Sequence, residues 1–266
     1  MENSMTTLAE QLPDSMMSGP ICCSDEEFLV LKVEQLNESP GHLTGYDCPL
    51  CKNRGDSAYA VNGEIVWRPC QCRKIRRSLK QIRESGMEQM LKTKTFATYQ
   101  AKEIWQQKLL KLVHDYAQHS SSEWMILAGS PGAGKTHLCT AACGVLLEQG
   151  VEVRYMLWLD ESQKLKAAKN DLAYEELVRP WKKASVLYID DLFKTRRGEN
   201  VGDADIRLAF ELINARYVDS QKRTIISSER TLEEIVDLDQ GLGGRLREKS
   251  KGFYASLSGK KDWRLK

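Results

Sequence analysis

A glycine-rich segment between an apolar run and a helical pattern constrains this chain more than any other feature. The apolar run covers residues 124–128, and the helical pattern begins at Lys135. Glycines leave room for backbone N–H groups to surround a phosphate, and the N-terminus of the next helix adds partial positive charge. The segment therefore predicts a phosphate-binding P-loop, made of Gly129, Ser130, Pro131, Gly132, Ala133, Gly134, Lys135 and Thr136.

Two side chains of this loop predict its ligand. Lys135 supplies a positive charge for the phosphates, and Thr136 offers a hydroxyl to Mg²⁺. The alternative is a glycine turn before an ordinary helix. Because three glycines, a lysine and a threonine coincide at the required spacing, a nucleoside triphosphate with Mg²⁺ is the better interpretation.

An apolar run that ends in two aspartates gives a second nucleotide signal. Residues 186–189 form the run, and Asp190 and Asp191 follow directly. In such a Walker B element the first carboxylate holds Mg²⁺ through water, and the second polarises the attacking water. A strand can also end in an aspartate that caps a helix, but the P-loop favours Walker B. We expect slow hydrolysis, because aspartate is one methylene shorter than the glutamate usual at the second position.

The next predicted strand ends in three polar residues, Ser227, Ser228 and Glu229. We expect Ser228 to hydrogen-bond the attacking water or the γ-phosphate. Ser227 or Glu229 would take this role if the register differs by one residue.

Apolar runs alternate with helical patterns through the C-terminal two thirds of the chain. This alternation predicts an α/β fold with a parallel sheet, whose ligands bind at the C-terminal ends of the strands. The predicted strands are 124–128, 151–157, 186–189 and 224–226, and the predicted helices are 101–119, 135–149, 160–169, 171–183 and 203–220.

Two cysteine pairs flank a predicted β-hairpin. Cys48 and Cys51 precede it, Cys70 and Cys72 follow it, and 62–63 is an Asn-Gly turn signal. A hairpin would bring the pairs together as a tetrahedral thiolate site, which suits Zn²⁺ and replaces a core too small to fold alone. The second pair has one intervening residue instead of the usual two. Reduced cysteines in a small core are the alternative, and His42 is a substitute fourth ligand.

Charge is distributed unevenly around this module. Residues 1–40 hold eight acidic side chains and one lysine, and Ser24 with Glu27 predicts a capping box for a short helix. A cationic amphipathic helix follows the fourth cysteine, with Arg73, Lys74, Arg76, Arg77, Lys80 and Arg83. It would contact single-stranded DNA or an acidic partner, or else would only connect two domains and leave its charges in water.

These patterns divide the chain into four parts. We predict an acidic arm with a short helix, a cysteine-rich zinc module that includes the basic helix, a linker and an ATPase domain. Their ranges are 1–44, 45–83, 84–95 and 96–266.

Bulk properties limit the class of protein. The chain has 266 residues, a formal net charge of +2 and eight cysteines. It shows neither a signal peptide nor an apolar run of about 20 residues, so we expect a cytoplasmic protein with no membrane partner. In that compartment cysteines favour metal sites or buried thiols over disulfides.

Six segments together resemble the AAA+ ATPases of the DnaC/DnaI helicase-loader type, in the phage and prophage form with an N-terminal cysteine-rich module. The resemblance runs from about Gly45 to the C-terminus. The segments are 45–55, 70–77, 129–136, 188–192, 227–229 and 242–246.

The resemblance implies a three-layer P-loop core with little or no helical lid, and a slow ATPase that acts as a switch. It implies ATP and Mg²⁺ as ligands, a replicative DNA helicase and single-stranded DNA as partners, and a homo-oligomer when ATP is bound. Arg245 would be the arginine finger, although from the residues alone it could cap a helix or lie on the surface. Arg264 is a candidate sensor-2 residue. Phe96 and Tyr99 would border the adenine, or would simply pack.

Two other functions compete with this one. An IstB-like transposition helper shares the ATPase core, but the cysteine module argues against it. A small-molecule P-loop kinase would need an acceptor pocket and usually a lid of paired arginines, and residues 196–197 look more like a solvent or DNA loop.

Overall fold

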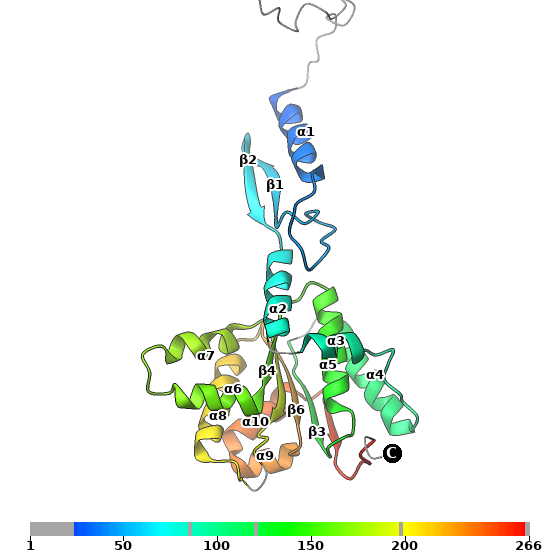
Figure 1. Ribbon diagram of the computed structural model, residues 1–266, viewed down its shortest axis with the longest axis vertical. Helices are drawn as coiled ribbons and strands as arrows, with labels where there is room; N and C mark the ends of the chain where they lie inside the picture. The colour runs from blue at the N-terminus through cyan, green and yellow to red at the C-terminus, as the bar shows by residue number, and fades with distance from the viewer. Residues whose placement is uncertain (1–23, 85–86, 120–121, 197–198, 264–266) are drawn as a thin grey trace, which may run out of the picture. The chain divides into compact units, whose positions relative to one another are not determined.

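The computed structural model describes residues 24–84, 87–119, 122–196 and 199–263 (Figure 1). The chain divides into two compact units, which are Met1–Cys70 and Gln71–Lys266. Each unit is considered by itself.

Residues 24–70, the described part of the N-terminal unit, contain one helix, α1 (Asp25–Glu38), and one hairpin, β1 (Asp56–Val61) with β2 (Glu64–Pro69). Helix α1 begins with the predicted capping box, in which Glu27 N–H donates to Ser24 Oγ and Ser24 N–H donates to Glu27 Oε2. The predicted Asn62-Gly63 turn closes the hairpin, with φ of 51° and 80°. These positive values fit an Asn-Gly turn, because asparagine and glycine tolerate the left-handed region best.

Helix α1 is joined to the hairpin by one amide side chain. Asn37 Nδ2 donates to the Ala58 carbonyl at 2.9 Å, and the Ala58 N–H donates to Asn37 Oδ1 at 3.0 Å. No residue of α1 is buried. Polar contacts therefore position this helix more than hydrophobic burial does.

In its described residues, the C-terminal unit is built on a five-stranded sheet of order β4-β5-β6-β3-β7, in which all neighbours are parallel. Its elements are α2 (Cys72–Glu84), α3 (Glu88–Thr93), α4 (Ile104–Gln118), β3 (Met125–Gly129), α5 (Lys135–Glu148), β4 (Val153–Leu157), α6 (Trp158–Ala167), α7 (Tyr174–Lys183), β5 (Val186–Leu192), α8 (Asp203–Tyr217), β6 (Arg223–Ser228), α9 (Leu232–Leu238), α10 (Gln240–Lys249) and β7 (Tyr254–Leu257).

Helices cover both faces of this sheet. Along β3 successive side chains alternate between two cores, because side chains of a strand point to opposite faces. Ile126 and Ala128 join a core with residues of α6 to α10, and Met125 and Leu127 join a core with residues of α4 and α5. The predicted three-layer α/β fold is thus confirmed.

Strand β7 (Tyr254–Leu257) was not predicted. It has only four residues, and it pairs in parallel with β3, from Ile126↔Tyr254 to Gly129↔Leu257. Such a short edge strand carries little periodicity of its own. Its place is fixed by backbone pairing with a strand far away in sequence.

The segment that we predicted as a linker, 84–95, contains helix α3. Met87 just before it is fully buried, in the same core as Ile82 of α2. Ile75 and Ile82 are buried and α2 packs against β4, so the basic helix packs within the C-terminal unit, although its first residue, Cys72, is one of the four cysteines predicted to bind zinc. Among the described residues no helix is long and apolar enough to cross a membrane.

Candidate nucleotide and metal sites

The P-loop lies between β3 and α5, at the C-terminal end of β3, which pairs with β6 on one side and β7 on the other. Gly129, Gly132 and Gly134 have positive φ values of 118°, 69° and 91°. These values explain the glycines, because other residues rarely adopt them. Gly129 is also constrained by space, since an added Cβ would lie 2.5 Å from the Ser258 backbone nitrogen.

Lys135 lies inside this loop and is largely buried. Its Nζ donates to the Gly129 carbonyl at 2.7 Å and to the Ser130 carbonyl at 2.8 Å. Burial lowers the pKa of this ammonium, and the carboxylates of Asp191 and Glu229 partly oppose that effect. The lysine is thus held at the position where a phosphate would receive its charge.

Asp190 accepts hydrogen bonds from four hydroxyl groups. Oδ1 accepts from Thr136 Oγ1 at 3.1 Å, Tyr188 Oη at 2.6 Å and Ser227 Oγ at 2.5 Å, and Oδ2 accepts from Tyr155 Oη at 3.1 Å. The carboxylate is 4% exposed. The Thr136 contact joins the two residues that we predicted to hold Mg²⁺.

The two tyrosines beside Asp190 were missed by sequence reasoning. Burial raises the pKa of both hydroxyls, and the charge of Asp190 raises it further, so they remain donors. Tyr188 was predictable, because it precedes Asp190 by two residues on one strand and therefore shares its face. Tyr155 is the cross-strand partner of Tyr188 in β4, which only the sheet order reveals.

The contacts of Asp191 differ from those of Asp190. Its φ is 56°, its N–H donates to Ser227 Oγ at 2.9 Å, and its Oδ2 is 2.7 Å from Lys194 Nζ. Lys194 also contacts Glu229 Oε1 at 3.1 Å. Burial alone would lower the pKa of Lys194, but the hydrogen bonds and charges of these two carboxylates raise it.

Ser228, which we predicted beside the γ-phosphate, has its hydroxyl engaged elsewhere. It donates to the Leu192 carbonyl at 2.8 Å and accepts from the Arg230 N–H at 3.1 Å. Its neighbour Ser227 contacts Asp190 and the Asp191 N–H, and Glu229 contacts Lys194. Which of these three residues meets the attacking water stays a prediction.

A cavity of about 440 Å³ is lined by P-loop residues together with Asp191, Lys194 and Glu229. Tyr99 lines it and packs on Gly134, and burial raises the pKa of the Tyr99 hydroxyl to about 12. Phe96 is absent from the described lining and instead contacts His114 edge to face, with ring centroids 5.4 Å apart. The lining residues are Lys94, Thr98, Tyr99, Gln100, Lys102, Gln106, Pro131, Gly132, Ala133, Gly134, Lys135, Thr136, His137, Asp191, Lys194, Glu229 and Trp263.

A segment after β7 reaches the P-loop, which sequence reasoning did not foresee. The Trp263 N–H donates to the Gly132 carbonyl at 3.3 Å, and an added Cβ at Gly132 would collide with the Asp262 carboxylate. Strand β7 and residues 262–263 therefore both contact the P-loop. Arg264, our sensor-2 candidate, lies outside the described residues.

Arg245 lies on α10, and within this chain it is not part of the described cavity lining. Its Nε donates to Asn214 Oδ1 at 3.1 Å, and its Nη1 donates to the Gly241 carbonyl at 2.8 Å. The guanidinium also lies 4.8 Å from the centroid of the Phe210 ring. Its predicted role in a neighbouring subunit stays a prediction.

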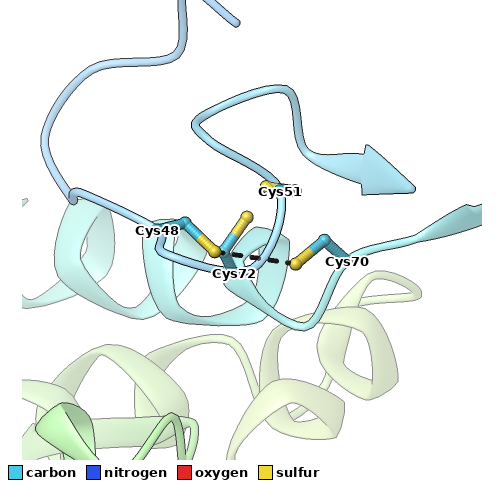
Figure 2. A group of neighbouring side chains, drawn as sticks. All are labelled: Cys48, Cys51, Cys70 and Cys72. Atoms are coloured by element: carbon cyan, nitrogen blue, oxygen red, sulfur yellow. Dashed lines mark hydrogen bonds between the residues drawn. The ribbon is translucent and has the colours of Figure 1, made fainter. Parts of the chain in front are cut away.

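The four predicted zinc ligands form one group. The sulfur atoms of Cys48, Cys51, Cys70 and Cys72 all lie within 4.8 Å of one another, and all four residues are buried (Figure 2). A tetrahedral thiolate site with Zn–S bonds of about 2.3 Å needs sulfurs about 3.8 Å apart. The Cys48 and Cys70 sulfurs are 3.7 Å apart, so this donor set fits Zn²⁺.

The backbone around the first pair supports thiolate ligands. The Gly55 N–H donates to Cys51 Sγ at 3.2 Å, and the Cys48 N–H donates to Asn53 Oδ1 at 2.9 Å. An N–H aimed at sulfur stabilises the negative thiolate that a metal requires. His42, the substitute ligand, is exposed and stands outside the group.

Sequence comparisons show that this chain belongs to the IstB-like ATP-binding family. A family model described as IstB-like ATP binding protein matches residues 56–241. The chain is 32% identical over 234 residues to the phage-like element PBSX protein XkdC of Bacillus subtilis, with 80% of this chain and 83% of that protein covered. It is also 34% identical over 102 residues to a protein of Sinorhizobium fredii described as an insertion sequence ATP-binding protein, with 38% and 32% covered.

A comparison with solved structures supports the fold. The crystal structure of the DnaC helicase loader matches with a TM-score of 0.52 and 21% identity. The match covers 64% of this chain and 98% of that one. At this level of identity the likeness establishes an AAA+ fold.

Proposed function

Because the chain belongs to the IstB-like ATP-binding family, as a phage-type member with the AAA+ fold, we propose that it is an ATP-controlled helicase loader. It would bind a replicative DNA helicase through its N-terminal region and place it on single-stranded DNA in the cytoplasm. The observation that carries this proposal is the cysteine group beside an AAA+ core. The family match begins at residue 56, so the first cysteine pair lies outside the part shared with IstB-like proteins.

The nucleotide site suits a slow ATPase. Lys135 and the P-loop N–H groups would hold the phosphates, and Thr136 with Asp190 would hold Mg²⁺, which neutralises charge on the phosphates when bound. Four hydroxyls donate to Asp190 and fix the orientation of its carboxylate. Asp191 would polarise the attacking water, with Ser227 fixing its backbone. With slow turnover, ATP would stay bound long enough for the nucleotide state to control assembly of the protein, as in a switch.

The four cysteines would hold one structural Zn²⁺ that folds the N-terminal module. Their fit to a tetrahedral site supports this assignment. Zinc would supply stability only. The metal takes no part in ATP hydrolysis.

The basic helix α2 would provide the contact with single-stranded DNA. Ile75 and Ile82 face the core, which leaves the basic side chains on the outer face. Arg73, Lys74, Arg77, Lys80 and Arg83 are exposed. Binding through such charges depends steeply on salt, because counterions are released from the nucleic acid.

Partner capture tests the proposal. The tagged full-length chain, with an ATP analogue or with ADP, would be mixed with lysate of the bacterium that encodes it, and retained proteins identified by mass spectrometry. We expect the replicative helicase, in an amount that depends on the nucleotide. Lys135→Ala is the control for nucleotide dependence.

An IstB-like transposition helper is the second candidate, which the family match and the insertion-sequence relative favour. Capture of a transposase in place of the helicase would decide for it. Cys51→Ser separates the two further, since loss of the cysteine module should abolish helicase capture but spare a partner that binds the ATPase core.

A further inference from the structure

Lys194 occupies a position that the nucleotide chemistry described above does not use. Its Nζ bridges two carboxylates, Asp191 Oδ2 at 2.7 Å and Glu229 Oε1 at 3.1 Å. All three residues line the cavity that contains the P-loop. Among the described lining residues, Asp191 and Glu229 are the acidic ones, so one lysine neutralises both.

Stability does not explain this bridge. The side chains of Lys194, Glu229 and Asp191 are 40%, 41% and 20% exposed, and ion pairs that solvent reaches in this way contribute little to folding. The bridge also depends on an unusual backbone. Asp191 and Phe193 have φ of 56° and 63°, which is uncommon for residues other than glycine and costs energy.

Two contacts hold the backbone of residues 191–194 in place. The Phe193 side chain is buried and contacts Trp158 edge to face, with ring centroids 5.6 Å apart. Ser227 accepts the Asp191 N–H. The pairing of β5 with β6 is irregular between Ile189 and Leu192. The result of this local distortion is that Asp191 and Lys194 both reach the cavity.

We propose that Lys194 recognises the γ-phosphate and thereby distinguishes ATP from ADP. Without a γ-phosphate its ammonium pairs with Asp191 and Glu229. A γ-phosphate offers a stronger negative partner, so Lys194 transfers to it and releases Asp191 to polarise water. A ligand shifts such an equilibrium only through contacts that differ between the two states, and ADP lacks this contact.

This inference rests on ATP use, which is part of the proposed function, and it concerns binding rather than turnover. Dissociation constants of a non-hydrolysable ATP analogue and of ADP, each with Mg²⁺, would be measured by calorimetry. Lys194→Met should weaken the analogue about tenfold and leave ADP unchanged, because one charge-assisted hydrogen bond is lost. Lys194→Arg should retain most of the preference.

A matched control and an opposite variant sharpen the test. Arg196→Met removes a nearby positive charge whose Nη2 donates to Gln163 Oε1, and it should change neither constant. Glu229→Gln removes one competitor for Lys194, so the analogue should bind about threefold more tightly while ADP does not. This second variant tests the proposal even where Lys194→Met fails to fold.

Several outcomes overturn the proposal. Equal weakening of both nucleotides would make Lys194 a structural residue of the cavity, and unchanged constants would make it a surface ion pair. Lys135→Ala separates these failures from failure of the proposed function. If it still binds both nucleotides normally, the cavity is not a nucleotide site at all.

Discussion

The two units of this protein have different sources of stability. In the N-terminal unit α1 buries no residue, and the hairpin leaves Tyr59 and Trp67 about half exposed, at 46% and 48%. In the C-terminal unit strand β3 is buried along its whole length. We therefore propose that the first unit relies on the cysteine group to fold, whereas the second folds through hydrophobic burial.

Removal of metal should have the largest effect, and mainly on the N-terminal unit, because that unit supplies Cys48, Cys51 and Cys70, whereas Cys72 begins α2. Chelation should release about one Zn²⁺ per chain and unfold residues 45–72, because the thiolates lose their common ligand. The ATPase core should keep its melting transition. Metal analysis and hydrogen exchange measure both outcomes.

Two variants in the same loop control this result. Cys51→Ser should lose zinc, whereas Leu50→Ser, at a position 63% exposed, should keep it. A zinc-free preparation that is still cooperatively folded over residues 45–72 would show that the cysteines merely pack.

Lys135→Ala should abolish tight ATP binding, since it removes the cation held inside the P-loop. We expect a loss of at least about 100-fold in affinity, measured by calorimetry. Zinc content should stay at that of the unaltered protein. Loss of zinc in this variant would contradict the separation of the two units.

Arg245→Ala should bind ATP nearly normally but hydrolyse it about 1000-fold more slowly, if the guanidinium acts on a neighbouring subunit. Mixing it with Lys135→Ala should restore some activity, because an intact site in one chain then meets an intact finger in the other. ATPase activity should also rise more steeply than protein concentration. If no mixing ratio restores activity, Arg245 has only a structural role, through its contacts with Asn214 and Phe210.

Asp191→Asn should leave ATP and Mg²⁺ bound, because Asp190 and Lys135 are unchanged. Hydrolysis should fall about 100-fold, since an amide cannot polarise water as a carboxylate does. Binding and turnover measured on one preparation separate these effects. A loss of affinity as large as that of Lys135→Ala would refute the division of roles.

Much of this architecture could be predicted from local sequence. The P-loop, the Walker B strand, the capping box at Ser24 and the Asn62-Gly63 turn each depend on residues close together in the chain. Spacing alone also predicted the four cysteines as a group. Local chemistry fixes such features before tertiary contacts form.

Tyr188 beside Asp190 and helix α3 are missed features that are local in the sequence, but the others depend on pairing between distant segments. Strand β7 is defined by β3, the contact of Tyr155 with Asp190 requires the order of β4 and β5, and Trp263 meets the P-loop only after β7 is placed. The preference for Ser227 over Ser228 beside the aspartates depends on where the β5–β6 pairing becomes irregular. The local pattern of apolar and polar residues does not predict such contacts between distant segments.

The central claim is that bound ATP controls delivery of a helicase to DNA, and a loading assay tests it most directly. Purified replicative helicase from the encoding bacterium would be incubated with closed circular single-stranded DNA, and helicase retained on the circles would be measured after gel filtration. With ATP the full-length protein should raise the retained fraction severalfold, and Lys135→Ala should not. Equal retention with the unaltered protein, with Lys135→Ala and without either would contradict the account.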